Sequence, residues 1–160
     1  MFAYTLFETA IGRCALAWGP RGIIGVQLPE RSPEATRIRL MRLCPNADEL
    51  EPPKQIARAI EDIGALLRGE KKSLRAVQLD LSRVPAFNAR VYETTRAIAP
   101  GATRTYGEIA RAIGEPDGAR AVGQALGRNP FAIVVPCHRV VGANDKLVGF
   151  SANGGVKTKL

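Results

Sequence analysis

The chain has 160 residues, of which 46% are hydrophobic and 24% charged, so its composition is that of one medium domain or two small ones and excludes a mainly disordered chain. No stretch approaches the roughly 18 apolar residues of a membrane-spanning helix, and the first residues lack the pattern of a signal peptide. One histidine and three widely spaced cysteines predict a reduced, cytoplasmic protein without a metal site or a disulfide framework.

The positive charge is concentrated in the second half of the sequence. The whole chain carries a net charge of +8. Residues 1–82 contain 12 Lys or Arg and 10 Asp or Glu, whereas residues 83–160 contain 11 and 5. A basic C-terminal half favours a polyanionic partner, with nucleic acid ahead of an anionic membrane. Solubility alone explains the charge about equally well.

Residues 1–82 predict a small α+β domain. Three short strands are expected within residues 3–28, with turns at Ile11-Gly12 and Gly19-Pro20. Two helices follow, one from Ser32 to about residue 43 and one from Pro52-Pro53 to Gly69, and a strand is expected over residues 76–82. This part has no cluster of acids, no phosphate-binding loop and no histidine, so we interpret it as a scaffold.

Residues 83–160 change to a helical pattern. Helices are predicted over residues 87–99, 106–114 and 118–128, and the last two, joined by a tight turn, have the pattern of a helix-turn-helix. An apolar strand is expected over residues 131–135 and a hairpin around residues 142–146. This order of elements predicts a winged helix-turn-helix domain.

The helix predicted over residues 118–128 contains several glycines, each of which costs roughly 1 kcal/mol in a helix interior relative to alanine. Ala119, Gly123 and Gly127 lie four residues apart on a strip almost without side chains, from which Arg120 projects. Two interpretations stay open: close packing against a neighbouring helix, or docking on DNA with the arginine entering the duplex.

Cys137 stands in a distinctive context, between Pro136 and His138 and just after an apolar run. A cysteine near His or Arg is more easily ionised, and the thiolate is the nucleophilic form. A Cys-His pair is weak evidence by itself, because adjacent side chains of an extended chain point in opposite directions. Cys137 is therefore either a nucleophile or a buried structural cysteine, whereas Cys14 and Cys44 are expected to be structural.

The run from Asn129-Pro130 to Pro-Cys-His-Arg-Val at 136–140 carries a specific resemblance. Together with Arg-Ala-Val-Gly at 120–123 and Thr-Tyr-Gly-Glu-Ile-Ala at 105–110, it resembles the O6-alkylguanine-DNA alkyltransferases. The similarity covers residues 85–160, and residues 1–82 match only in layout. It implies an N-terminal sheet with helices in a ribonuclease-H-like layout (residues 1–82), then a winged helix-turn-helix domain (residues 83–160).

The family transfers an alkyl group irreversibly from O6 of guanine in double-stranded DNA to its own cysteine, once per molecule. The resemblance implies that Cys137 accepts the group and that His138 acts as general base through a water. Tyr106 would donate to the leaving guanine, and Asn129 would link the recognition helix to the active-site strand. No cofactor or metal is implied, and a monomer is expected.

For DNA, the resemblance implies that Arg120 enters the stack where the damaged base is flipped out. Ala119 and Gly123 would fit the minor groove. The pocket would use the backbone carbonyls of Cys137 and Val140, with Phe150 and Ser151 as its walls.

The sequence departs from the family pattern after Gly154-Gly155. In relatives a longer terminal helix follows and carries a glutamate that hydrogen-bonds the histidine, whereas no acidic residue follows Asp145 here. We therefore expect a truncated terminal helix and a histidine without its orienting carboxylate. Direct-reversal repair remains the leading hypothesis. A lesion-binding protein with weak or no transfer is the alternative, and a cysteine hydrolase ranks far below both.

Overall fold

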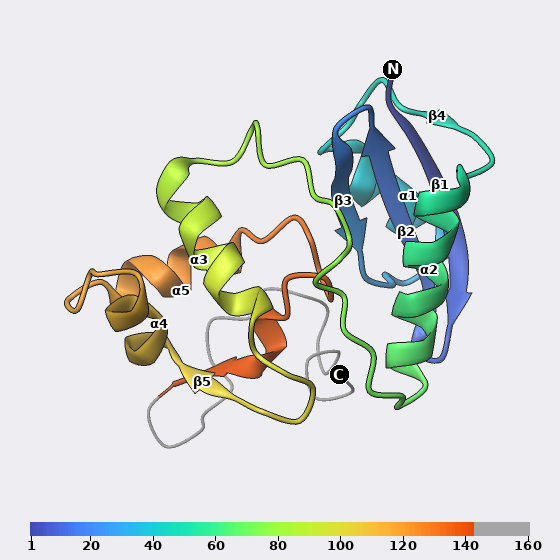
Figure 1. The fold of residues 1–160 in the computed structure, drawn as a ribbon. Coiled ribbons are helices and arrows are strands. Elements are labelled where there is room, and N and C mark those ends of the chain that lie inside the picture. Colours follow the sequence, from blue (N-terminus) through green and yellow to red (C-terminus); the bar gives the residue numbers. More distant parts are fainter. Residues whose placement is uncertain (143–160) are drawn as a thin grey trace. The chain divides into compact units, whose positions relative to one another are not determined.

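The computed structural model describes residues 1–142. The chain forms two compact units, one made of Met1–Leu81 with Pro130–Val134 and the other of Ser82–Asn129 with the residues from Val135 on. The helices and strands, shown in Figure 1, are β1 (Ala3–Thr9), β2 (Gly12–Gly19), β3 (Gly22–Gln27), α1 (Pro33–Met41), β4 (Asp48–Glu49), α2 (Lys54–Leu67), α3 (Ala86–Arg96), β5 (Arg104–Thr105), α4 (Tyr106–Ala112), α5 (Ala119–Gly127), the 3₁₀ turn η1 (Cys137–Arg139) and β6 (Val140–Val141).

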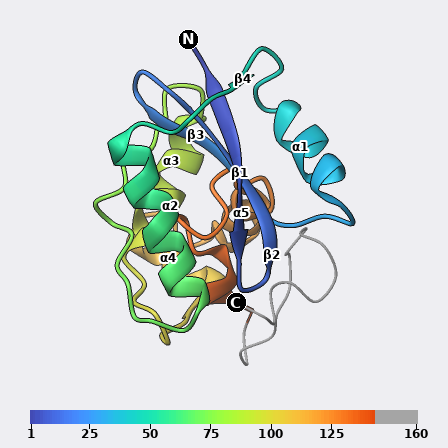
Figure 2. The same cartoon turned by 90° about the vertical axis from the view of Figure 1, so that its right-hand side faces the viewer.

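The first unit is a four-stranded sheet with one helix on each face. Its strand order is β3-β2-β1-β4, and β1 and β2 form an antiparallel pair in which Ala3 lies opposite Trp18. The short β4 pairs in parallel with β1. Figure 2 shows α1 and α2 on opposite sides of this sheet. The sheet is therefore covered on both faces, as expected of a scaffold with its own core.

Alternation along β2 divides the core of this unit between the two faces. Ala15 and Ala17 pack with Leu40 and Cys44 on the α1 side. Leu16, with none of its surface exposed, points to the opposite face because successive strand residues alternate. The predicted start of α1 is confirmed, since the Ser32 hydroxyl accepts the Ala35 N–H at 3.1 Å.

The strand predicted over residues 76–82 is wrong in extent. Only Leu79 bridges β3: the Ile23 N–H donates to the Gln78 carbonyl at 2.9 Å, and the Asp80 N–H donates to the Ile23 carbonyl at 2.8 Å. The chain is in a turn just before this point, where the Val77 N–H donates to the Leu74 carbonyl at 3.1 Å. Leu79 and Leu81 are therefore only half-buried, and they do not extend a ladder.

The second unit contains the three predicted helices, each shorter than expected. Helix α3 ends at Arg96 and α4 ends at Ala112, just before Gly114, whose φ is 81°. Helix α5 has Gly118 as its N-cap, without a side-chain cap bond. The helices α4 and α5 pack against each other and against α3, so the helix-turn-helix prediction is confirmed. The predicted hairpin lies mostly outside the described residues.

The strand predicted over residues 131–135 is also wrong. Its start pairs with β3, where the Val26 N–H donates to the Pro130 carbonyl at 2.8 Å and Phe131 bridges Val26. Ile133 then has a φ of 74°, and the Val134 N–H closes a three-residue turn on the Ala132 carbonyl at 2.8 Å. This reversal prevents a continuous strand and directs the chain back into the second unit.

Candidate active site

Cys137 opens the turn η1, whereas the other two cysteines lie within the first unit. All three are buried: Cys137 is 8% exposed, Cys14 0% and Cys44 3%. Burial raises the pKa of Cys14 to about 11, which keeps it a thiol at neutral pH. Burial does not distinguish the three cysteines, but position does, because Cys137 lies in the second unit, in the 3₁₀ turn that also contains His138.

Backbone bonds hold the Cys137 turn in place. The Cys137 N–H donates to the Val135 carbonyl at 2.7 Å, and the same carbonyl accepts the side-chain amide of Asn129 at 3.0 Å. Pro136, between them, has φ −78° and ψ 67°, the geometry of an inverse γ-turn. Asn129 thus connects the chain directly after α5 to the segment that precedes Cys137.

Arg139 anchors the other end of η1. Its guanidinium donates to the Ile98 carbonyl at 2.8 Å, just after the C-terminus of α3, where a positive charge is favoured. Burial lowers the pKa of Arg139 from its usual value. Arg139 is close to Cys137 in sequence, but its described hydrogen bond, to the Ile98 carbonyl, is structural.

Tyr106 is brought towards Cys137 by the pairing of β5 with β6. These two strands run in parallel, with Arg104 opposite Val140 and Thr105 opposite Val141. Tyr106 is the first residue of α4, and its position is set by a capping box in which Thr105 and Glu108 exchange hydrogen bonds. Burial raises the pKa of the Tyr106 phenol, and the negative charge of a Cys137 thiolate acts in the same direction. The phenol therefore stays protonated and able to donate.

Helix α5 has one buried face and one exposed polar face. Val122 and Leu126 are buried, and the exposed side carries Arg120, Gln124 and Arg128 at one-turn intervals. Gly123 faces the protein: a Cβ built on it would lie 3.8 Å from Cδ1 of Tyr106. At this position the packing interpretation of the glycine strip has direct support.

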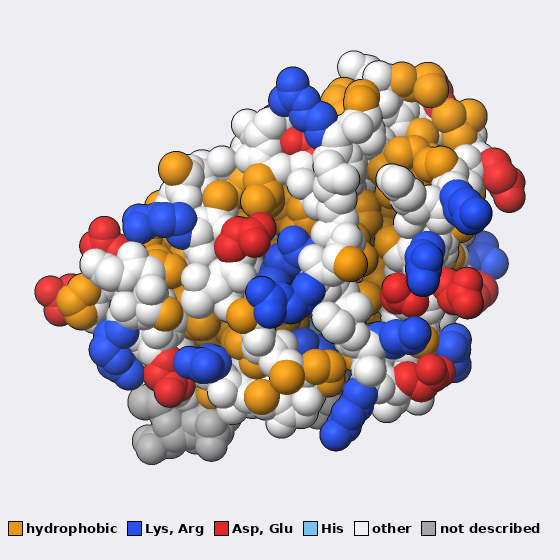
Figure 3. Space-filling model, in the orientation of Figure 1, with side chains coloured by type: hydrophobic (Ala, Val, Ile, Leu, Met, Phe, Trp, Pro, Cys, Tyr) orange, Lys and Arg blue, Asp and Glu red, His pale blue; other side chains and the backbone are white. Residues whose placement is uncertain are grey.

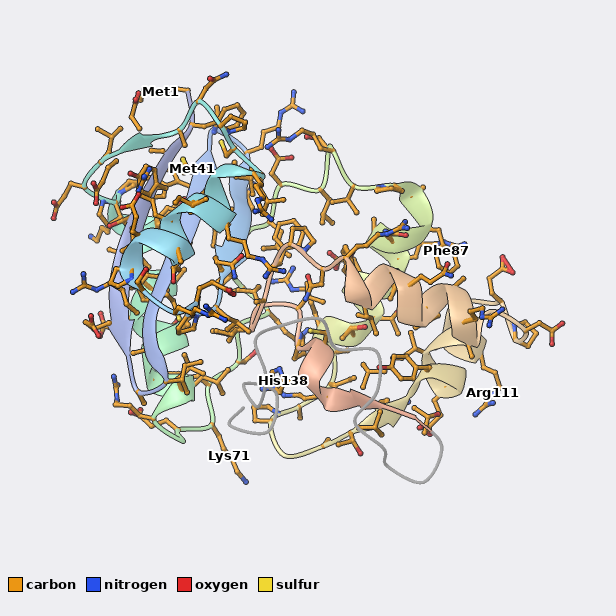
Figure 4. The ribbon with its side chains drawn as sticks, turned by 180° about the vertical axis from the view of Figure 1, so that it is seen from behind. Met1, Met41, Lys71, Phe87, Arg111 and His138 are labelled. Atoms are coloured by element: carbon orange, nitrogen blue, oxygen red, sulfur yellow. The ribbon has the colours of Figure 1, made fainter. Side chains whose placement is uncertain are left out.

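Of the remaining predicted site residues, some lie within the described residues and others lie outside them. His138 lies in η1, half-buried, and Figure 4 shows it at that turn. Val140, the first residue of β6, is fully buried in the unliganded chain. The Cys137 carbonyl accepts the Val140 N–H. Phe150 and Ser151 lie outside the described residues.

Sequence reasoning missed Tyr92 as a neighbour of Cys137. Tyr92 lies on the buried side of α3 and is 1% exposed, and its hydroxyl donates to the Ala125 carbonyl of α5 at 2.7 Å. Burial raises its pKa to about 12, and the Cys137 charge adds to this effect. Amphipathic spacing predicts that this side chain is buried, but no sequence signal identifies its partner.

Charged side chains are mixed on the surface that Figure 3 shows, where Lys and Arg alternate with Asp and Glu. Arg111 of α4 extends outward from its helix in Figure 4.

Among residues 1–142, no group of three or more His, Cys, Asp or Glu is arranged to hold a metal ion. In the same range, no helix is both long and apolar enough to cross a membrane.

Comparison with known proteins identifies the family. Residues 86–160 match the family model described as 6-O-methylguanine DNA methyltransferase, DNA binding domain. A methylated-DNA–protein-cysteine methyltransferase of Mycolicibacterium paratuberculosis is 39% identical over 99% of this chain and 88% of its own length. One from Mycobacterium leprae is 46% identical over 96% of this chain and 85% of its own length. The chain belongs to the methylated-DNA–protein-cysteine methyltransferase family.

Solved structures of the family agree with this fold. The crystal structure of Mycobacterium tuberculosis OGT in complex with DNA has a TM-score of 0.78 at 33% identity, covering 98% of this chain and 88% of its own. The Mycobacterium tuberculosis O6-methylguanine methyltransferase has a TM-score of 0.77 at 36% identity, over 99% and 88%. The predicted α+β fold is confirmed, and the chain is a DNA-binding methyltransferase of direct DNA repair.

Proposed function

We propose that Cys137 accepts the alkyl group from O6 of an alkylated guanine in double-stranded DNA, irreversibly and once per chain. One observation carries this proposal: Cys137 stands in a chain reversal held at both ends, by Asn129 through the Val135 carbonyl and by Arg139 through the Ile98 carbonyl. A displacement at carbon needs the sulfur in line with the bond that breaks, and a fixed backbone supplies that orientation.

The reaction balances with groups of this chain. The Cys137 thiol loses its proton to His138, through a water, and its sulfur forms a bond to the alkyl carbon. The bond from that carbon to O6 breaks, and its electron pair goes to guanine, which takes up a proton. The Tyr106 hydroxyl, kept protonated by burial, donates to the base as negative charge develops on it. No cofactor takes part in these steps.

The proposed DNA surface is the exposed face of α5. Arg120 would occupy the space that the flipped guanine leaves, and Ala119 would allow α5 to enter the minor groove closely. Gln124 and Arg128 continue the same exposed face. Gly123, next to the Tyr106 ring, would serve the site by leaving room for that ring.

Intact-protein mass spectrometry tests the acceptor. Mixing the chain with an O6-methylguanine duplex should add the mass of one CH₂ group per chain, and peptide mapping should place it on Cys137. Cys137→Ala should abolish the gain, whereas Cys14→Ala and Cys44→Ala should keep it because both lie in the core of the scaffold. Binding to the duplex without any gain in mass would favour the lesion-binding alternative.

Substitution of Arg120 tests the DNA surface. Arg120→Ala should slow repair of a duplex because an exposed side chain that fills the stack is lost, while the thermal stability of the chain should hardly change. The matched control is Arg111→Ala, which removes an exposed arginine of α4. Affinity for DNA should fall steeply with rising salt. Repair by Arg120→Ala at the normal rate would refute its proposed role.

A further inference from the structure

The Tyr92 hydroxyl connects two helices of the second unit at a point close to Cys137. It donates to the Ala125 carbonyl at 2.7 Å, a buried bond between α3 and α5. The side chain of Asn88, one turn earlier on α3, interacts with the same hydroxyl and opposes the rise of its pKa. The bond to Ala125 orients the hydroxyl of Tyr92 towards α5.

The acceptor of this bond is a carbonyl in the last turn of α5, where carbonyls lack a full set of partners within the helix. Ala125 also accepts the Arg128 N–H at 3.2 Å, and the Asn129 N–H donates to Leu126 at 3.2 Å. The hydroxyl of Tyr92 thus fixes the turn from which the chain leaves α5 towards Asn129.

Asn129 connects the end of α5 to the backbone of Cys137. Its side-chain amide donates to the Val135 carbonyl, which also accepts the Cys137 N–H. A continuous series of hydrogen bonds and one short stretch of chain therefore leads from α3 through α5 to the backbone of Cys137. Displacement of the end of α5 would tilt the peptide that orients the sulfur.

We propose that Tyr92 is a positioning residue for alkyl transfer, acting through the Ala125 carbonyl and Asn129 to hold the Cys137 backbone. The inference rests on the proposed role of Cys137 as the acceptor. The ring of Tyr92 is in the core and does not contact DNA in this scheme, so its effect belongs to the transfer step and not to binding.

The test separates transfer from binding. Tyr92→Phe removes only the hydroxyl and should lower the first-order transfer rate at saturating duplex roughly fivefold to tenfold, the size of one lost buried hydrogen bond. The Kd for unmodified duplex should change less than about twofold, because α5 keeps its exposed face. Transfer from the free base O6-methylguanine should slow by the same factor, since this substrate does not dock on α5.

The matched control is Tyr4→Phe, which removes the hydroxyl of another buried tyrosine, one that lies in the first unit. It should leave the transfer rate unchanged. Asn129→Ala should slow transfer as well. The double variant Tyr92→Phe/Asn129→Ala should slow transfer by less than the product of the two single effects, because both residues act through the same series of hydrogen bonds. Asn88→Ala, which keeps Tyr92, should lower the rate in the same direction and provides the test if Tyr92→Phe does not fold.

Three outcomes would overturn the inference. A normal transfer rate in a folded Tyr92→Phe chain would do so, as would an effect confined to the Kd for DNA or an equal effect of Tyr4→Phe. The unaltered chain is measured alongside: if it transfers nothing to Cys137, the proposed function itself fails. If it transfers normally and Tyr92→Phe matches it, only the role of Tyr92 fails.

Discussion

Ile133 adopts a backbone conformation that branched side chains rarely take, with a φ of 74° and only 2% of its surface exposed. Such a residue costs on the order of 1–3 kcal/mol and persists only where its surroundings hold it. Here it is held by the burial of its side chain and by the Pro130 and Phe131 contacts with Val26. The strain lies four residues before Cys137, in the segment that turns the chain back towards the nucleophile.

Burial of Cys14 makes the free energy of unfolding depend on pH in the alkaline range. Its pKa is raised to about 11 in the folded chain by burial, above the usual value of a free cysteine. The thiol form is therefore favoured by folding, and its contribution is complete below pH 9 and lost as pH rises towards 11. The free energy of unfolding, measured by urea titration, should fall over this range more steeply in the unaltered chain than in Cys14→Ala. Equal slopes would contradict the prediction.

The candidate nucleophile could be predicted from sequence, but the hydrogen bonds that hold its turn in place could not. Cys137 and His138 were singled out by a motif of adjacent residues, and the structure places both in one turn. The bond of Asn129 to Val135 and the bond of Arg139 to Ile98 depend on how the chain returns on itself. No local pattern encodes these pairings, and Tyr92 was missed for the same reason.

Gly123 of α5 lies next to the Tyr106 ring. A methyl group on Gly123 would make an ordinary contact with the Tyr106 ring, at 3.8 Å, and would remove a helix-interior glycine. Gly123→Ala should therefore raise the free energy of unfolding by up to about 1 kcal/mol. The transfer rate and DNA affinity should stay within about twofold, the range of a change under 0.5 kcal/mol.

A larger residue at the same place should behave differently. Gly123→Leu should displace the Tyr106 ring and lower the transfer rate more than the DNA affinity. A more stable Gly123→Ala chain that no longer bound DNA would show instead that this position faces the duplex. Thermal unfolding, duplex titration and mass spectrometry on the same samples distinguish these results.

The three strands predicted within residues 3–28 are confirmed as β1, β2 and β3, and the predicted helices are all present. The starts of α1 and α4 carry local signals, a capping serine in one and a capping box in the other. The segments 76–82 and 131–135 have the apolar residues of strands, but a strand also needs a partner along its length, and both segments form only isolated bridges. That partner is distant in sequence, so local pattern overestimated both strands.

At the scale of the whole molecule, the chain leaves the first unit at Leu81, returns for Pro130–Val134 and then enters the second unit again. Unfolding of either unit therefore releases the ends of a segment that the other needs. We predict one cooperative transition. The single tryptophan, Trp18, reports on the first unit by fluorescence, and the reactivity of Cys137 towards a thiol reagent reports on the second.

The two probes should give the same urea midpoint within error. Far-ultraviolet circular dichroism, which follows the helices of both units, should coincide with them. Separate midpoints for Trp18 and Cys137 would show that the return of Pro130–Val134 does not couple the units.

The late return of Pro130–Val134 also bears on synthesis in the cell. While a ribosome is still producing Ser82–Asn129, the Val26 edge of β3 has no partner from Pro130, because that residue has not yet been made. An open sheet edge on a nascent chain is a site for wrong pairing with other chains. The segment that closes it is followed within three residues by Cys137, so the nucleophile emerges only once the scaffold can be completed.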